Sequence, residues 1–168
     1  MIFVTVGTSE DRFDRLMTAV GALERTERLL VQTGASDVRP AGATCLDFLP
    51  YDELVEYVRA ARVVVTHAGV GTVLTALLAG KRPVVVPRLR RLGEAVDDHQ
   101  LAFARRLAGA GLVTLVEDMS ELGAAVADTA VLQTTFRGGG GRLAQELATL
   151  IELETGAPPA PVELPHAA

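Results

Sequence analysis

A histidine, two glycines and a threonine lie between two strongly apolar segments, in the sequence HAGVGT at residues 67–72. Gly69 and Gly71 remove side chains where a backbone must turn and approach a ligand closely. A helix that begins there presents free N–H groups and the positive end of its dipole, which suits a phosphate. His67 and Thr72 add side-chain donors. The pattern predicts an anion site; the alternative is a tight strand-to-helix turn that contains a structural histidine.

Two other loops carry polar residues of the same kind. Gly7-Thr8-Ser9 follows the first apolar segment, where Ser9 could instead be only a helix N-cap. Asp97-Asp98-His99-Gln100 opens a later helical pattern and could form hydrogen bonds to sugar hydroxyls. The alternative is that it forms only a capped, solvated first turn of a helix. The Asp-Asp-His run lacks the helical spacing that a metal site needs, so no metal is expected there.

Three arginines, Arg88, Arg90 and Arg91, form a basic patch in an otherwise acidic chain. Most exposed charges of this kind are simply solvated. Beside a phosphate site, however, they could steer a phosphate-bearing ligand or touch a membrane surface.

Two familiar nucleotide-binding motifs are absent around residue 70. Leu74 stands where a dinucleotide fingerprint requires its third glycine, and Thr75 stands where a P-loop requires its first. Gly80-Lys81 is followed by Arg82 rather than by a hydroxyl residue. A dehydrogenase or a P-loop NTPase is therefore disfavoured. No catalytic triad, nucleophile elbow or pair of catalytic carboxylates can be assigned.

Strand-like apolar segments alternate with helical patterns along the chain. We expect strands at 2–6, 28–33, 44–49, 63–66, 83–87 and 112–116. Helical patterns cover 11–24, the segment from 51 onward, 70–79, 97–108, 122–129 and a last segment after the glycine run 138–141. Continuously apolar strands that alternate with helices indicate an α/β fold with a doubly wound parallel sheet, Rossmann-like, whose ligands bind at the carboxyl ends of the strands.

Length and composition indicate one domain. The 168 residues predict a single domain over 1–155, followed by a tail rich in proline and alanine at 156–168. The net charge of −5 argues against nucleic-acid binding, and the single cysteine fits a reducing, cytoplasmic setting. The sequence shows no membrane-spanning stretch and no secretory signal.

Three motifs in order resemble the C-terminal, donor-binding domain of family 28 glycosyltransferases. They are FVTVGTS at 3–9, THAGVGTVLTALLAGKRPVVVPR at 66–88 and LGEAVDDHQLAFARRL at 92–107. The chain is most similar to the soluble catalytic subunit of bipartite enzymes, of the bacterial exopolysaccharide type, which is related to the eukaryotic dolichol-linked N-acetylglucosaminyltransferase subunit. The resemblance implies half of a GT-B glycosyltransferase.

The resemblance also assigns roles to the loops. Gly69, Gly71 and Thr72 would hold the donor diphosphate beside His67, and Gln100 would contact the donor sugar. Many relatives have a ribose-binding acid where this chain has Thr75, and asparagine is more usual at Asp97. The implied UDP-sugar contacts are Gly7, Thr8, His67, Gly69, Val70, Gly71, Thr72, Thr75, His99 and Gln100.

The implied reaction is transfer of a hexose unit from a UDP-sugar to a lipid-linked acceptor in polysaccharide biosynthesis, with inversion and without a cofactor. A membrane-anchored, acceptor-binding partner subunit would hold the enzyme at the inner face of the membrane and supply the general base. An isolated copy could self-associate through the surface meant for that partner. The alternative is a non-catalytic nucleotide-binding or scaffolding subunit of such a complex.

Overall fold

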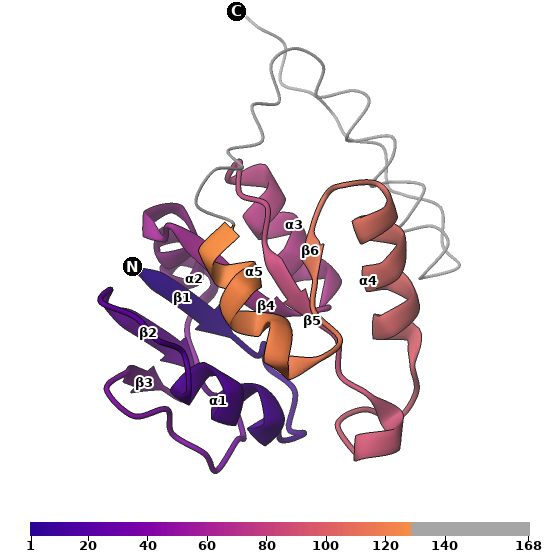
Figure 1. Ribbon diagram of the computed structural model, residues 1–168, viewed down its shortest axis with the longest axis horizontal. Helices are drawn as coiled ribbons and strands as arrows, with labels where there is room; N and C mark the ends of the chain where they lie inside the picture. The colour runs from indigo at the N-terminus through magenta and orange to yellow at the C-terminus, as the bar shows by residue number, and fades with distance from the viewer. Residues whose placement is uncertain (129–168) are drawn as a thin grey trace, which may run out of the picture. The chain divides into compact units, whose positions relative to one another are not determined.

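In the computed structural model the described residues, 1–128, form a parallel six-stranded sheet with helices on both faces (Figure 1). The strands are β1 (Ile2–Thr5), β2 (Leu29–Gln32), β3 (Thr44–Leu46), β4 (Val63–His67), β5 (Val84–Val86) and β6 (Thr114–Leu115). The helices are α1 (Asp14–Gly21), α2 (Tyr51–Ala60), α3 (Val70–Leu78), α4 (His99–Gly109) and α5 (Leu122–Asp128), with short 3-10 turns η1 (Arg90–Leu92) and η2 (Met119–Glu121).

The strand order is β3-β2-β1-β4-β5-β6, and every neighbouring pair is parallel. The chain moves outward from β1 in one direction and from β4 in the other. β1 and β4 are paired from Ile2 with Val63 to Thr5 with Thr66, so the loops after them leave the sheet side by side. This is the topological switch point, where ligands of doubly wound sheets bind.

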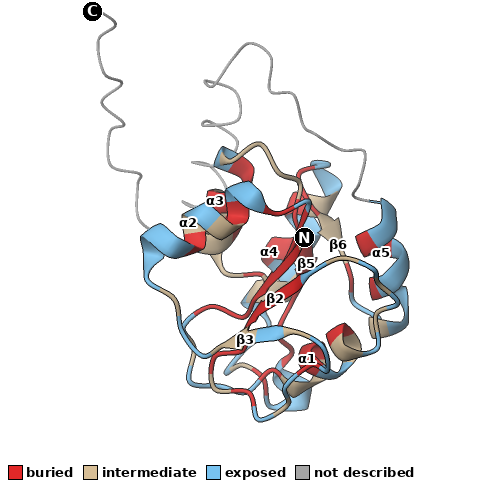
Figure 2. Cartoon of the chain, turned by 90° about the vertical axis from the view of Figure 1, so that its left-hand side faces the viewer, coloured by how far each residue is buried: buried red, intermediate tan, exposed pale blue. Residues whose placement is uncertain are grey.

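The core has two layers because the strands are buried on both faces. On one face α1 and α5 pack through Leu16, Met17, Val20 and Val126 against β-branched strand residues. On the other face α2 and α3 pack around Phe3, which is fully buried. Figure 2 shows the inner strands buried between the helices, whereas β3 and β6, the two edge strands, are partly exposed. Each fully buried Val or Leu contributes about 1.5–3 kcal/mol, so this sheet is a rigid base for the loops at its edge.

The predicted fold class is confirmed, and each strand and helix expected up to residue 128 is present. Most are shorter than predicted by one or more residues at an end. The N-cap prediction for Ser9 is wrong: α1 begins at Asp14, and the Ser9 hydroxyl instead accepts a hydrogen bond from the Asp11 N–H at 3.2 Å. The predicted last helix, the glycine run 138–141 and the tail 156–168 lie outside the described residues.

The helices of the described part, up to Asp128, are each too short or too polar to cross a lipid bilayer.

Candidate functional site

A cavity of about 430 Å³ opens at the switch point between β1 and β4. It is formed by the loop after β1, the loop after β4, the first turns of α3 and the start of α2. Its lining residues are Gly7, Thr8, Gln32, Leu49, Tyr51, Leu54, His67, Gly69, Gly71, Thr72 and Thr75. Seven of these were predicted as ligand contacts: Gly7, Thr8, His67, Gly69, Gly71, Thr72 and Thr75.

The imidazole of His67 packs between two glycines that have no room for a side chain. A Cβ at Gly7 would lie 2.4 Å from the His67 Cε1 atom, and one at Gly69 would lie 2.1 Å from Nε2. Gly7 also has φ of 74°, a conformation that residues with a side chain rarely adopt. The ring therefore braces the two loops from within, and it also forms part of the cavity wall.

The backbone at Gly7 is fixed by two buried polar side chains from the sheet. Its N–H donates to the Thr5 hydroxyl at 3.2 Å, and its carbonyl accepts from the Gln32 amide at 3.3 Å. Thr5 and Gln32 also bond to each other. The loop is therefore held in place by the protein rather than by a ligand, which reduces the entropy that binding must overcome.

The start of α3 forms part of the cavity lining. Gly69 is the N-cap residue, and no side chain caps this first turn. Gly71 lines the cavity and has open space where its Cβ would be. The N–H groups of the first turn, together with the Thr72 hydroxyl, form a donor set suited to a phosphate.

Apolar and hydroxyl side chains also line the cavity. Leu49 and Leu54 are the apolar ones, and the hydroxyls of Tyr51 and Thr75 lie 3.3 Å apart. Thr75 donates to the Gly71 carbonyl at 2.8 Å and is 6% exposed, whereas Tyr51 is 70% exposed. Tyr51 is therefore the hydroxyl that a ligand can reach.

His67 is neutral in the folded protein at neutral pH. Burial lowers its pKa to about 4, assisted by the positive charge of Arg88 and opposed by a backbone hydrogen bond at Thr5. A neutral imidazole can donate one N–H to a ligand but brings no charge. Phosphate binding here therefore depends on the helix start and on backbone donors.

The prediction of a basic surface patch is wrong for Arg88. Its side chain is 1% exposed and its guanidinium bonds to backbone carbonyls, because the loop after β5 folds over it. Arg90 and Arg91 are exposed, and their steering role stays a prediction.

Three predicted contacts do not line the cavity. Val70 is the first residue of α3, and His99 is an exposed residue at the start of α4 that pairs with Asp97. Gln100 is partly buried, and its amide oxygen accepts the Arg88 N–H at 3.2 Å. Asp98 occupies the N-cap position of α4, but its carboxylate accepts from the Arg90 N–H instead.

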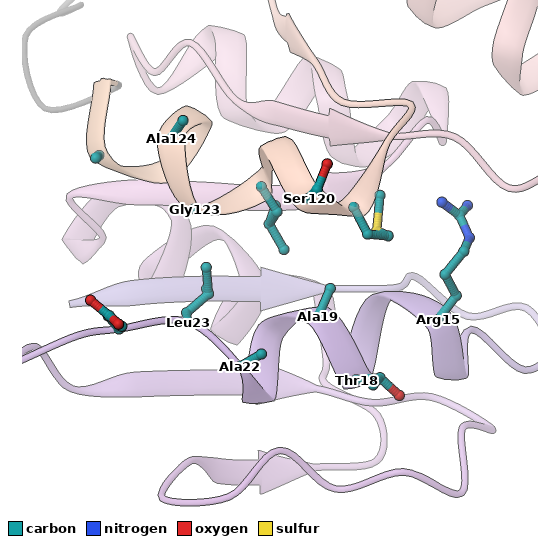
Figure 3. A pocket seen from close by; sticks show the side chains of 12 residues that line it. Arg15, Thr18, Ala19, Ala22, Leu23, Ser120, Gly123 and Ala124 are labelled. Atoms are coloured by element: carbon teal, nitrogen blue, oxygen red, sulfur yellow. The ribbon is translucent and has the colours of Figure 1, made fainter.

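A larger cavity of about 960 Å³ lies elsewhere, between α1 and the segment formed by η2 and α5 (Figure 3). Small and apolar side chains such as Ala19, Ala22 and Leu23 line most of it. It lacks glycine loops and a free helix start, so it does not offer the donor set found at the switch point.

Sequence reasoning missed Gln32, Leu49, Tyr51 and Leu54 at the site. Gln32 had a detectable signal, since it is a polar residue at the end of the apolar run LLVQ and is 1% exposed. The other three had no signal of their own, because their position depends on how α2 begins beside the cavity.

The sequence matches the model of a known family. The model of the glycosyltransferase family 28 C-terminal domain matches residues 1–133. The chain belongs to this family. Human UDP-N-acetylglucosamine transferase subunit ALG13 is 37% identical to this family 28 domain over 119 residues, which cover 63% of the chain and 10% of ALG13. The chain thus matches about a tenth of that relative's length.

Solved glycosyltransferases share the fold of the family 28 domain. The glycosyltransferase of kitacinnamycin has a TM-score of 0.56 at 20% identity, covering 92% of this chain and 39% of that one. MurG from Acinetobacter baumannii has a TM-score of 0.51 at 23% identity, covering 94% of this chain and 46% of that one. SnogD from Streptomyces nogalater has a TM-score of 0.50 at 20% identity, covering 91% and 43%. These likenesses confirm a Rossmann-like domain of the kind found in GT-B glycosyltransferases, and the chain spans less than half of each.

Proposed function

We propose that this domain is the donor-binding, catalytic subunit of a glycosyltransferase that uses a UDP-sugar and acts with a partner subunit. The observation that carries the proposal is the cavity at the switch point, which is lined by a helix start without a side-chain cap and by the apolar residues Leu49 and Leu54. The name of ALG13 makes UDP-N-acetylglucosamine the first donor to test. A lipid-linked acceptor in polysaccharide assembly, of the bacterial exopolysaccharide type, is the proposed setting.

The cavity lining offers a suitable group for each part of a UDP-sugar. The diphosphate would occupy the helix start at Gly71 and Thr72. The ribose would lie beside the Tyr51 hydroxyl, and the uracil against Leu49 and Leu54. The sugar would extend beyond Gly7 and Thr8 toward the first turn of α4, where Gln100 lies.

The proposed reaction is attack of an acceptor hydroxyl on the anomeric carbon, with inversion. The bond from that carbon to the β-phosphate oxygen breaks, and UDP leaves with the electron pair. N–H donors at the start of α3 would stabilise the negative charge that develops on the leaving oxygen. The proton of the acceptor hydroxyl passes to a general base.

The general base is assigned to the partner. No Asp or Glu lines the cavity within the described residues, and the pKa of His67, about 4, makes its imidazole a weak base. A base works best with a pKa near the working pH. Loss of transfer on replacement of a single acid or histidine of the partner, with UDP binding unchanged, would support this assignment.

The partner is proposed to dock at the carboxyl edge of the sheet. Four large apolar side chains are exposed in the segments that follow β3 and β5: Phe48, Tyr51, Leu92 and Val96. Exposed apolar groups that gather at one edge mark an interaction surface. An apolar rim beside the donor cavity fits a second protein half that closes over the substrates. A membrane-anchored partner would place the enzyme at the inner face of the membrane.

Calorimetry with UDP tests the proposal. We expect saturable UDP binding by the full chain, alone or with its partner, and sugar transfer only with the partner present. Absence of UDP binding under both conditions would reject the donor-site proposal and favour a scaffolding subunit. UDP binding without transfer in the reconstituted complex would reject the catalytic role.

Tyr51→Phe tests the ribose position. Because an intramolecular or ligand hydrogen bond contributes about 0.5–1.5 kcal/mol, we expect UDP affinity to fall about three- to tenfold. The affinity for 2′,3′-dideoxy-UDP should be the same for the parent and the variant, because that ligand has no ribose hydroxyl to lose. Tyr57→Phe is the control, since Tyr57 packs its ring on Phe3 away from the cavity. An equal loss for both ligands would place the ribose elsewhere.

A further inference from the structure

Arg88 is the largest of the fully buried side chains in the described part of the chain, and its hydrogen bonds go to the backbone. Its guanidinium donates to four carbonyl oxygens at 3.0 to 3.3 Å, those of Val6, Asp11, Arg12 and Glu94. It also lies over the Phe13 ring, with its carbon 4.6 Å from the ring centre. The Nε atom is buried without a hydrogen-bond partner.

Stability alone does not account for this arginine. Burial lowers its pKa, which shows that the environment opposes the charge, although Asp11 and Glu94 favour it. The nearby Glu94 carboxylate is itself occupied by Arg15 and by the Leu89 N–H. An apolar side chain of similar size often serves a buried position as well as a charge does. The specific geometry of the contacts therefore indicates a role beyond packing.

The contacts of Arg88 reach both sides of the proposed donor site. The loop that carries Gly7 and Thr8 is held at both ends. The carbonyl of Val6 lies at its start, and those of Asp11 and Arg12 lie at its end. On the other side, the Arg88 N–H donates to the Gln100 amide oxygen. Since β4 lies between β1 and β5, Arg88 spans the carboxyl end of β4, which carries His67.

We propose that Arg88 is a positioning residue for the donor site. Its guanidinium holds the Gly7–Thr8 loop, and its backbone N–H holds the side chain of Gln100. Arg88 thereby fixes the position of this loop relative to Gln100, on the two sides of β4. Arg88 does not line the cavity, so it acts through these groups rather than on the ligand. This inference rests on the proposed function for its effect on UDP, whereas its effect on the loop is independent of any ligand.

Arg88→Met removes the donors and keeps the length of the side chain. The matched control is Arg82→Met: Arg82 precedes β5 at the opposite end of the strand, donates to the Val113 carbonyl at 3.3 Å and also has a buried Nε without a partner. Two measurements on the full chain are compared, hydrogen exchange of backbone amides and calorimetry with UDP. Arg88→Lys keeps the charge and serves if Arg88→Met does not fold.

We expect Arg88→Met to increase exchange at least tenfold at the buried, hydrogen-bonded amides of Gly7 and Phe13, which lie at the two ends of the loop, and to weaken UDP binding at least tenfold. Arg82→Met should leave both within twofold, and Arg88→Lys should fall between the parent and Arg88→Met. Unchanged exchange at Gly7 and Phe13 in Arg88→Met would overturn the proposal, as would an equal effect of Arg82→Met. If the parent fails to bind UDP, the proposed function fails, and the exchange data still decide whether Arg88 holds the loop.

Discussion

Gly7→Ala is expected to abolish measurable UDP binding and to destabilise the protein by about 2–5 kcal/mol. Two physical causes add. The φ of 74° at Gly7 places a Cβ in a left-handed conformation, which costs about 1–2 kcal/mol. The new methyl group would also lie 2.4 Å from the His67 Cε1 atom, and such overpacking costs about 1–3 kcal/mol. Displacement of the ring or of the loop disrupts the cavity that both line.

Gly80→Ala separates the two causes. Gly80 has a matching φ of 72°, lies at the far end of α3 and has open space around its Cβ position. Gly80→Ala should therefore lose only the conformational part of the stability, about 1–2 kcal/mol. Its affinity for UDP should equal that of the parent. Stability is measured by urea unfolding and affinity by calorimetry.

A second substitution tests the contact with His67 directly. In the double variant Gly7→Ala/His67→Ala the methyl group no longer meets the ring, so part of the lost stability should return. The double variant should be more stable, by at least about 1 kcal/mol, than the sum of the two single-variant losses predicts. Strictly additive effects would show that the ring and Gly7 do not touch.

The arrangement of elements was predictable because it depends on local pattern. Continuously apolar runs such as VVVT at 63–66 identify strands buried on both faces, and glycine after them identifies strand-to-helix turns. The loops of HAGVGT and Gly7-Thr8 were therefore placed correctly at one edge of the sheet. Exact strand ends were not predictable, because they depend on which neighbours complete the ladder.

The errors at the site have a common physical origin in contacts distant along the chain. From its local sequence Arg88 is expected to be a surface charge. It is buried in the structure, where its guanidinium donates a hydrogen bond to the carbonyl of Val6, 82 residues earlier. Tyr51 reads as an ordinary first helical residue, yet α2 carries it to Thr75, 24 residues later. Gln32 reaches Gly7 only through the pairing of β1 with β2. Contacts between residues so far apart along the chain cannot be inferred from a local sequence pattern.

The stability of the protein is expected to fall by about 2 kcal/mol between pH 7.5 and pH 5, and by about 3 kcal/mol by pH 4, through His67. Its pKa in the folded protein, about 4, lies below the unfolded value of 6.5 because the ring is buried beside Arg88. Between these values the unfolded chain binds the proton and the folded protein does not. The stabilisation is therefore complete above pH 6.5 and is lost as pH falls toward 4.

His67→Gln removes the titrating group and should flatten the dependence of unfolding free energy on pH between 7.5 and 5. Glu27 acts in the same direction, but Arg62 lowers its pKa from 4.5 to about 2, so its effect falls below this window. His99→Gln, which changes an exposed side chain, is the matched control and should retain the slope. If His67→Gln keeps the full slope, His67 is not held neutral by the fold. The ring could then carry charge toward a phosphate, and phosphate binding would not depend on the helix start and backbone donors alone.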